Sequence, residues 1–193
     1  AFQNCTSLTK VTIPSSVVAI GAYAFNGCTG LNEIVFSEGL ERISDSAFTG
    51  CGNLTELSFP STLTNIGASA FQNCTGLSGL ALPENLSIIG SYAFSGCTGM
   101  TGGLTIPGSV SSMGEYAFQN CTGLDGKLII EAGEAKTIGS YAFSGCKKLT
   151  GVELGNGITT LGNYTFSNCS AMAGDLVIPD SVTIIGDYAF YNC

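Results

Sequence analysis

Nine cysteines divide this chain into units of 23 to 25 residues, and so regular a spacing leaves few folds open. They are Cys5, Cys28, Cys51, Cys74, Cys97, Cys121, Cys146, Cys169 and Cys193. A phenylalanine stands three residues before each of them, and alanine precedes that phenylalanine in every unit but one. A period of this length predicts a solenoid, in which each unit forms one coil and buries its apolar side chains against its neighbours. Residues 1–193 are therefore expected to form a single domain without an internal boundary.

Within each unit, an apolar–x–apolar stretch comes first, from Val11/Ile13 in the first unit to Leu176/Ile178 in the last. Its period of two predicts a short strand with one buried face. Proline follows this strand in five units and ends it, because proline donates no ladder hydrogen bond. The strands of successive coils are expected to pair in parallel, about 4.8 Å apart, to form one continuous sheet. Right-handed winding is expected for parallel crossovers.

A second apolar pair follows at a spacing of three residues, for example Leu63/Ile66 in the third unit and Ala135/Ile138 in the sixth. It predicts a short extended piece, after which glycine usually allows the backbone to bend. The Ala-Phe-x-x-Cys segment comes next and predicts a single turn of 3₁₀ or α-helix, which directs Phe and Cys toward the same side.

The full pattern, [V/L/I]-x-[I/L/F]-P-x-x-[V/L]-x-x-I-G-x-x-A-F-x-x-C, resembles the BspA-like leucine-rich repeats, also called the Treponema pallidum class. The resemblance covers the whole chain in eight consecutive copies. It implies an α/β fold, a right-handed leucine-rich-repeat solenoid of about eight coils with a parallel strand face and helical turns opposite. Thr62 departs from commoner leucine-rich repeats, which carry asparagine at this position. The resemblance also implies a bacterial or protozoan protein, secreted or on the cell surface, that adheres to host matrix proteins or to other cells.

Composition narrows the function classes. Only 6 Lys and Arg residues oppose 14 Asp and Glu, so the net charge is −8. Nucleic acids and anionic lipids are recognised by Lys and Arg, so neither is an expected partner. No apolar run approaches the roughly 20 residues that a membrane helix needs, so direct membrane insertion is not expected. The chain contains no histidine, which excludes Ser-His-Asp and Cys-His catalysis within it, and we expect neither an enzyme nor a cofactor.

The cysteines all occupy the same place in the coil, which indicates a buried column of structural free thiols. A disulfide or zinc site is the alternative. However, stacked side chains point in parallel, nine is an odd number, and zinc needs four converging ligands.

Six coils carry tyrosine two residues before the phenylalanine: Tyr23, Tyr92, Tyr116, Tyr141, Tyr164 and Tyr188. We interpret these as a half-buried stack on the convex side, with an adhesive surface as the alternative. The sixth coil has 25 residues and replaces proline by the segment 131–135. This segment is either a binding loop or a neutral insertion.

The outward side of the predicted strands is the expected partner-binding surface. Its residues are Lys10, Thr12, Glu33, Val35, Glu56, Ser58, Ala81, Thr105, Lys127, Ile129, Glu153 and Val177. This stripe lacks aromatic residues and arginine, the usual anchors of protein interfaces, and suits a broad, extended protein or glycan partner. A surface that binds nothing is the alternative.

The sequence thus predicts a non-enzymatic interaction module, with a passive spacer for another domain as the alternative and an enzyme fragment as a weak third. The chain begins and ends within its repeat motif, so we expect a fragment whose targeting signals lie elsewhere. End-to-end self-association is expected because neither end carries a polar capping repeat.

Overall fold

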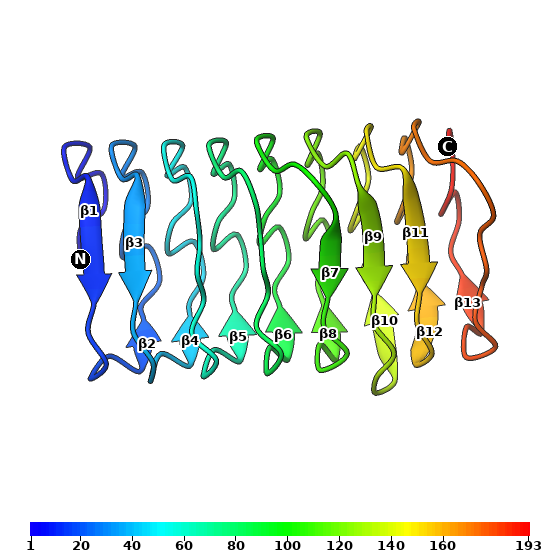
Figure 1. The fold of residues 1–193 in the computed structure, drawn as a ribbon, viewed down its shortest axis with the longest axis horizontal. Helices are drawn as coiled ribbons and strands as arrows, with labels where there is room; N and C mark the ends of the chain where they lie inside the picture. Colours follow the sequence, from blue (N-terminus) through cyan, green and yellow to red (C-terminus); the bar gives the residue numbers. More distant parts are fainter.

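The computed structural model describes all residues, 1–193, as a row of stacked coils (Figure 1). The chain forms short β-strands and no helix, and therefore has no helix that could span a membrane. One set of strands comprises β1 (Lys10–Ile13), β3 (Glu33–Phe36), β7 (Leu104–Ile106), β9 (Lys127–Ile130) and β11 (Gly151–Leu154). The other set comprises β2 (Ala19–Ile20), β4 (Arg42–Ile43), β5 (Asn65–Ile66), β6 (Ile88–Ile89), β8 (Ser112–Met113), β10 (Lys136–Ile138), β12 (Ile158–Leu161) and β13 (Ile184–Ile185).

The second set forms one continuous sheet of eight strands, in the order β13-β12-β10-β8-β6-β5-β4-β2. All of its pairs are parallel, and equivalent residues of neighbouring coils are in register, as in Ile43 with Ile66 and Ile66 with Ile89, except for a shift between Lys136 and Thr137 where β10 pairs with β12. An aliphatic side chain recurs here in each coil, so every strand offers the same inward contact to the next. The parallel-strand solenoid predicted from the sequence is thus confirmed, whereas its right-handed winding stays a prediction.

The first set does not form the continuous sheet that was predicted. β1 pairs only with β3, and β7, β9 and β11 form a separate three-stranded sheet. Between these two sheets, the positions of the first strand are joined only by an isolated bridge between Ser58 and Ala81. Phe36 and Phe59 lie side by side where the first sheet stops, with ring centroids 5.8 Å apart. The two rings mark the start of the interruption.

The predicted number of eight coils is also wrong, because the chain forms a solenoid of about seven coils and its last repeat is incomplete. Residues 176–178 of the last coil form no strand, although β13 still pairs with β12. Leu176 and Val177 are exposed there, and the loop before them swings outward at the C-terminal end of Figure 1. An edge segment has one neighbour instead of two, so it has half the ladder bonds and core contacts that hold an inner strand.

The helical turns predicted for the Ala-Phe-x-x-Cys segments are absent. In the third coil, the amides of Ser69, Phe71 and Asn73 donate to carbonyls of the next coil. The alternate amides, including that of Cys74, close tight turns within the coil. Ser69 and Asn73 also have left-handed φ angles of 54° and 59°. A helix would direct all its amides along its own axis, so the need to bond the neighbouring coil is incompatible with a helix here.

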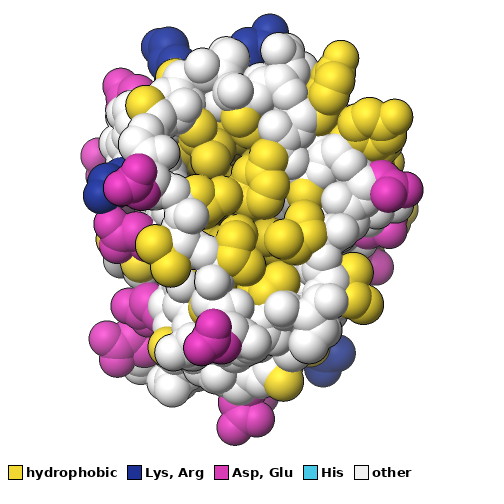
Figure 2. All heavy atoms as spheres, turned by 90° about the vertical axis from the view of Figure 1, so that its right-hand side faces the viewer, with side chains coloured by type: hydrophobic (Ala, Val, Ile, Leu, Met, Phe, Trp, Pro, Cys, Tyr) yellow, Lys and Arg dark blue, Asp and Glu magenta, His cyan; other side chains and the backbone are white.

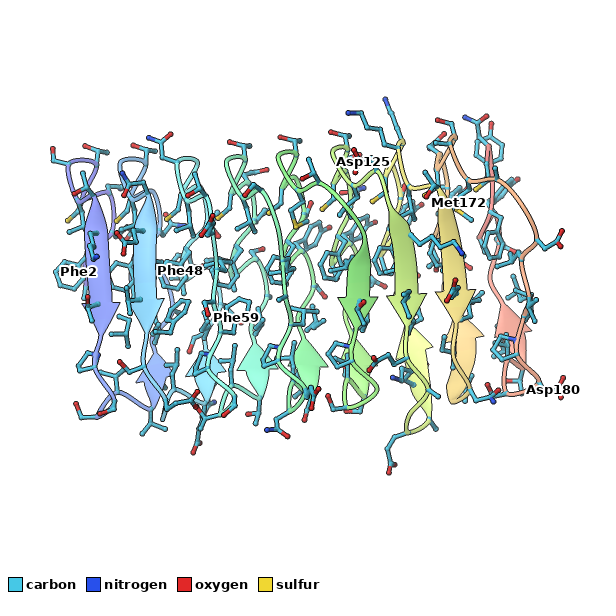
Figure 3. The ribbon with its side chains drawn as sticks, viewed as in Figure 1. Phe2, Phe48, Phe59, Asp125, Met172 and Asp180 are labelled. Atoms are coloured by element: carbon cyan, nitrogen blue, oxygen red, sulfur yellow. The ribbon has the colours of Figure 1, made fainter.

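The core is one column of side chains that runs through all the coils, and 46 buried apolar residues form a single cluster. The phenylalanines of the repeat stack along it, and Figure 3 shows Phe48 within this stack and Phe2 at its N-terminal end. Phe48 lies 5.1 Å from the ring of Phe25 and 5.2 Å from that of Phe71. Each ring covers the faces of its neighbours, so the interior coils support one another and no coil is stable alone.

The sixth coil places Lys136, not Ala135, in the core column. Lys136 pairs with Ile158 of the next coil and is 2% exposed, whereas Ala135 is exposed. The lysine stem replaces an aliphatic side chain, and its ammonium donates to the carbonyl of Gly108 at 3.1 Å. Burial lowers the pKa of Lys136, while the nearby Glu131 carboxylate partly offsets this effect. The prediction was wrong because the sixth coil has a longer turn, which shifts the register by one residue.

Apolar side chains gather at the centre of the C-terminal end (Figure 2). Ile184 and Ile185 of β13 are 56% and 53% exposed, and Tyr188 and Tyr191 are similarly exposed. In the interior coils, the next coil covers the residues equivalent to Ile185; Ile66 and Ile89, for example, are fully buried. Ile184 occupies the outward position of its strand, where Ile88 is also exposed in an interior coil. This end therefore presents the cross-section of the core to solvent.

Candidate interaction surface

All twelve residues predicted for the binding surface have exposed side chains. Lys10 and Thr12 lie on β1, Glu33 and Val35 on β3, Glu56, Ser58 and Ala81 in the interrupted centre, Thr105 on β7, Lys127 and Ile129 on β9, Glu153 on β11, and Val177 in the last coil. Strand residues alternate between the two faces of a sheet, and the neighbours of these residues enter the core. The surface, here called the strand face, therefore comprises two strips and an irregular centre, with Val177 outside any strand.

Two ion pairs join neighbouring coils on the strand face. The ammonium of Lys10 lies 2.6 Å from the Glu33 carboxylate, and that of Lys127 lies 2.8 Å from the Glu153 carboxylate. The hydrogen bond to Glu153 raises the pKa of Lys127. All four side chains are more than half exposed, so water and salt screen both pairs. The pairs orient these charges on the surface and leave Glu56 as the unpaired carboxylate near the centre.

The interrupted centre of the strand face has two hollows. One has a volume of about 600 Å³ and is lined by Glu33, Glu56 and Ser58, among others. The second has a volume of about 300 Å³ and includes Ala81 and Thr105 in its lining. The hollows lie on the two sides of the Ser58–Ala81 bridge, where the strands separate. Five of the twelve predicted residues are thus brought together around the break in the first sheet.

The cysteines form the predicted column of unpaired thiols, and all nine are free. Each interior thiol has a partner that the sequence did not predict. Cys74 donates to the backbone carbonyl of Phe48 in the preceding coil at 3.3 Å, and Cys97 donates to that of Phe71 at 3.1 Å. Burial raises the pKa of Cys97 to about 12, which keeps this thiol protonated and able to donate. The column is therefore a structural hydrogen-bonded ladder.

Five of the six tyrosines stack into a continuous row, here called the tyrosine row: Tyr92, Tyr116, Tyr141, Tyr164 and Tyr188. Neighbouring ring centroids are 4.6 to 4.9 Å apart. All five residues have left-handed φ angles between 56° and 60°. The sequence predicted the stack but not this backbone conformation. Ser46 and Ser69 occupy the same column in other coils and have the same left-handed φ angle.

Comparison with known proteins gives the same architecture. The family model for the BspA type leucine rich repeat region, in 6 copies, matches residues 1–125 and 126–193. The crystal structure of the T. pallidum leucine-rich repeat protein is 35% identical in sequence, with a TM-score of 0.69. That match covers 77% of this chain and 68% of the T. pallidum chain. No protein among those with curated descriptions matches.

A leucine-rich repeat protein from Eubacterium ventriosum is 28% identical, with a TM-score of 0.64, and the match covers 95% of this chain and 42% of that one. One from Bacteroides ovatus is 25% identical, with a TM-score of 0.50, and here the match covers 100% of this chain and 66% of that one. The chain thus spans between 42% and 68% of the lengths of these three proteins. The family model matches residues 1–125 and 126–193, which together make up the whole chain. This protein therefore belongs to the BspA-type leucine-rich repeat family.

Proposed function

We propose that residues 1–193 are a single non-enzymatic interaction domain of a secreted or cell-surface protein, which adheres to a host matrix protein or to another cell through the strand face. The pair of hollows at the centre of that face carries this proposal. They gather Glu56, Ser58 and Thr105 around exposed backbone where the first sheet is interrupted. Backbone groups that pair with no neighbouring strand can bond an extended partner segment, and membership of a repeat family with such surfaces supports the same role.

A passive spacer is the second candidate, and the two ion pairs favour it. Lys10 and Lys127 are the two lysines of the strand face, and each is neutralised by a glutamate of the next coil. A partner that used these charges would have to break the pairs. A spacer needs only a regular, stiff stack of coils, and the continuous eight-stranded sheet supplies one.

A surface-binding titration distinguishes the two candidates. The chain is titrated over immobilised matrix proteins and mucin glycans at low and at physiological salt. The test variant replaces five charged residues of the strand face by serine: Lys10, Glu33, Glu56, Lys127 and Glu153. The matched control replaces two basic and three acidic residues elsewhere: Arg42, Lys148, Glu41, Glu134 and Asp180. Both variants have the same net charge.

Saturable binding that is lost in the test variant and kept in the control supports the interaction domain. Binding that both variants lose equally reflects overall charge and contradicts the use of the strand face. No binding to any of these partners favours the spacer.

We also propose that the chain associates end to end, because the core is exposed at its C-terminal end (Figure 2). Replacing Ile185 by glutamate introduces charge onto this end, where that side chain is 53% exposed. Light scattering at high protein concentration is expected to show assemblies for the native sequence and monomers for the variant. Monomers in both cases would contradict the proposal.

A further inference from the structure

The tyrosine row occupies backbone positions that disfavour tyrosine. A left-handed φ angle costs a residue with a side chain roughly 1 kcal/mol relative to glycine, and Tyr116 and Tyr141 adopt φ angles of 60° and 58°. Serine fills the same position at Ser46 and Ser69 with φ angles of 55° and 54°. The fold therefore does not require tyrosine in this column, and its repeated use in strained conformations at the surface points to a role for the side chain.

The stacking limits which ligands the row can take. Each inner ring is covered on both faces by its neighbours, with interplanar angles of 5° to 7° from Tyr92 to Tyr164. A sugar ring or a cation placed over an aromatic face therefore has no free face on an inner tyrosine. What remains is a strip of ring edges and hydroxyl groups. Such a strip offers rigid apolar contact together with hydrogen-bonding oxygens, the combination by which tyrosine contributes to protein interfaces.

A groove of about 420 Å³ is lined by residues that come directly before the tyrosines of the row in the chain, and by none of the tyrosines themselves. Glu115, Ser140 and Asn163 line it, and each immediately precedes a tyrosine of the row. Its floor is glycine backbone: a Cβ atom added to Gly114 or Gly162 would lie 2.3 or 2.6 Å from a backbone nitrogen of the preceding coil. At these glycines, the backbones of neighbouring coils therefore pack directly against each other along the groove.

The charge beside the tyrosine row is negative. Burial, the neighbouring tyrosines and the Glu115 carboxylate raise the pKa of Tyr116, and Asp187 acts in the same direction on Tyr164. Neither lysine nor arginine lines the groove. Glu115 and Asp187 are exposed, and neither carboxylate forms an ion pair. A positively charged partner therefore finds both carboxylates free.

We propose that the tyrosine row, with Glu115 and Asp187, is a second interaction surface that binds an extended, basic polypeptide segment of a partner protein. The segment runs along the solenoid axis between the groove and the tyrosine row, its aliphatic stems against the tyrosine edges and its guanidinium or ammonium groups at Glu115, which lines the groove, and at Asp187, which follows the lining residue Gly186. Five coils spaced by about 4.8 Å span roughly 19 Å, the length of about six residues of extended chain. This surface is separate from the strand face, and its failure would leave the proposed function untouched.

Hexa-arginine and hexa-lysine peptides are the probes, with a neutral glycine-serine hexapeptide as the reference. Their affinities are measured by fluorescence anisotropy at low and at physiological salt. The main variant replaces Tyr116, Tyr141 and Tyr164 by serine, which the fold already accepts at Ser46 and Ser69 and which leaves the net charge unchanged. We expect the basic peptides to bind the native sequence and to lose roughly tenfold or more in affinity for this variant.

Two further variants separate the site from bulk charge. The first variant, Glu115→Gln with Asp187→Asn, removes two charges beside the tyrosine row. The second, Glu134→Gln with Asp180→Asn, removes two charges at the turns that lead from the strand face to the eight-stranded sheet. The first pair is expected to weaken binding several-fold more than the second, and it alters only exposed side chains, so it remains informative if the serine variant is unstable. Equal weakening by the two pairs, unchanged affinity in the serine variant, or equally tight binding of the neutral peptide would each overturn the proposal.

Discussion

Raising the pH from about 8 to about 10 is expected to destabilise this solenoid through its cysteine column. Burial raises the pKa of Cys51 and Cys97 from an ordinary value of 9.0 to about 12. The pKa values of Cys74, Cys121 and Cys169 are raised in the same direction and for the same reason. In this pH range, the folded chain keeps protons that the unfolded chain releases. The stabilisation by the protonated thiols is therefore fully present below the unfolded-state pKa of 9.0. It is lost as the pH rises toward the folded-state pKa values.

The magnitude follows from the unfolded state. At pH of about 10, a free thiol with a pKa of 9.0 is about nine-tenths ionised, and this ionisation stabilises the unfolded chain by about 1.4 kcal/mol for each thiol. Cys51 and Cys97 together then lower the free energy of unfolding by about 3 kcal/mol, and Cys74, Cys121 and Cys169 add to this loss in the same direction. The whole stability of a typical domain is about 5–15 kcal/mol. We therefore expect this chain to lose a large part of its stability at a pH of about 10, while it stays folded near neutrality.

Urea denaturation at a series of pH values, with a phosphine reductant to prevent disulfide formation, measures this effect. The matched series is Cys97→Ala, then Cys97→Ala with Cys74→Ala, then both with Cys121→Ala. Each replacement weakens the fold near neutral pH, because it removes a thiol hydrogen bond to a phenylalanine carbonyl. Cys97→Ala should also reduce the loss between neutral and alkaline pH by about 1 kcal/mol, and each further replacement should reduce that loss again. A free energy of unfolding that stays constant up to a pH of about 10, or equal losses in all variants, would refute the reasoning.

Three further perturbations test the packing. Phe94 is fully buried between two stacked rings, so Phe94→Ala is expected to lower the free energy of unfolding by about 3–5 kcal/mol. The ring of Phe2 is 48% exposed, so Phe2→Ala should cost much less. Equal shifts in melting temperature would contradict this. Lys136→Met keeps the stem in the core and should stay within about 1 kcal/mol of the native sequence, whereas Lys136→Glu should cost about 3 kcal/mol or more, by urea denaturation. Ser69→Asn should raise the melting temperature and Ser69→Val should lower it, because Ser69 has a φ angle of 54°.

Much of the fold follows from the repeat because a solenoid has few degrees of freedom. Once the spacing of the phenylalanines and cysteines assigns these residues to the core, the neighbours of each coil are fixed by the period alone. The alternation at Leu128 and Ile130 correctly predicted which side chains enter the core, and Lys127 and Ile129 were correctly assigned to the surface. The exposure of the strand face was therefore predictable from the sequence, whereas its use in binding stays a proposal.

Two of the predictions that were wrong, the helical turns and the core position of Ala135, share a cause, which is hydrogen bonding between neighbouring coils. The Ala-Phe-x-x-Cys segment suggested a helical turn on local spacing, but its alternate amides are bonded to the next coil. Ala135 was assigned to the core by counting from the preceding turn, but the register with β12 places Lys136 there. In both cases, hydrogen bonds between residues more than twenty positions apart determine the local structure. The sequence of a single repeat does not contain this information.

The sequence by itself determined the architecture of this protein: a stack of coils with one phenylalanine column, one thiol column and one tyrosine column. Periodicity is enough for this, because identical coils can bury identical side chains only by stacking in register. Only the tertiary structure decided where the first sheet breaks, which hollows the break opens, and that the tyrosines stand at left-handed positions beside a groove with a glycine floor. These features depend on how the side chains and backbone of adjacent coils fit together. Such a fit is a property of coil pairs in space, not of the repeat pattern.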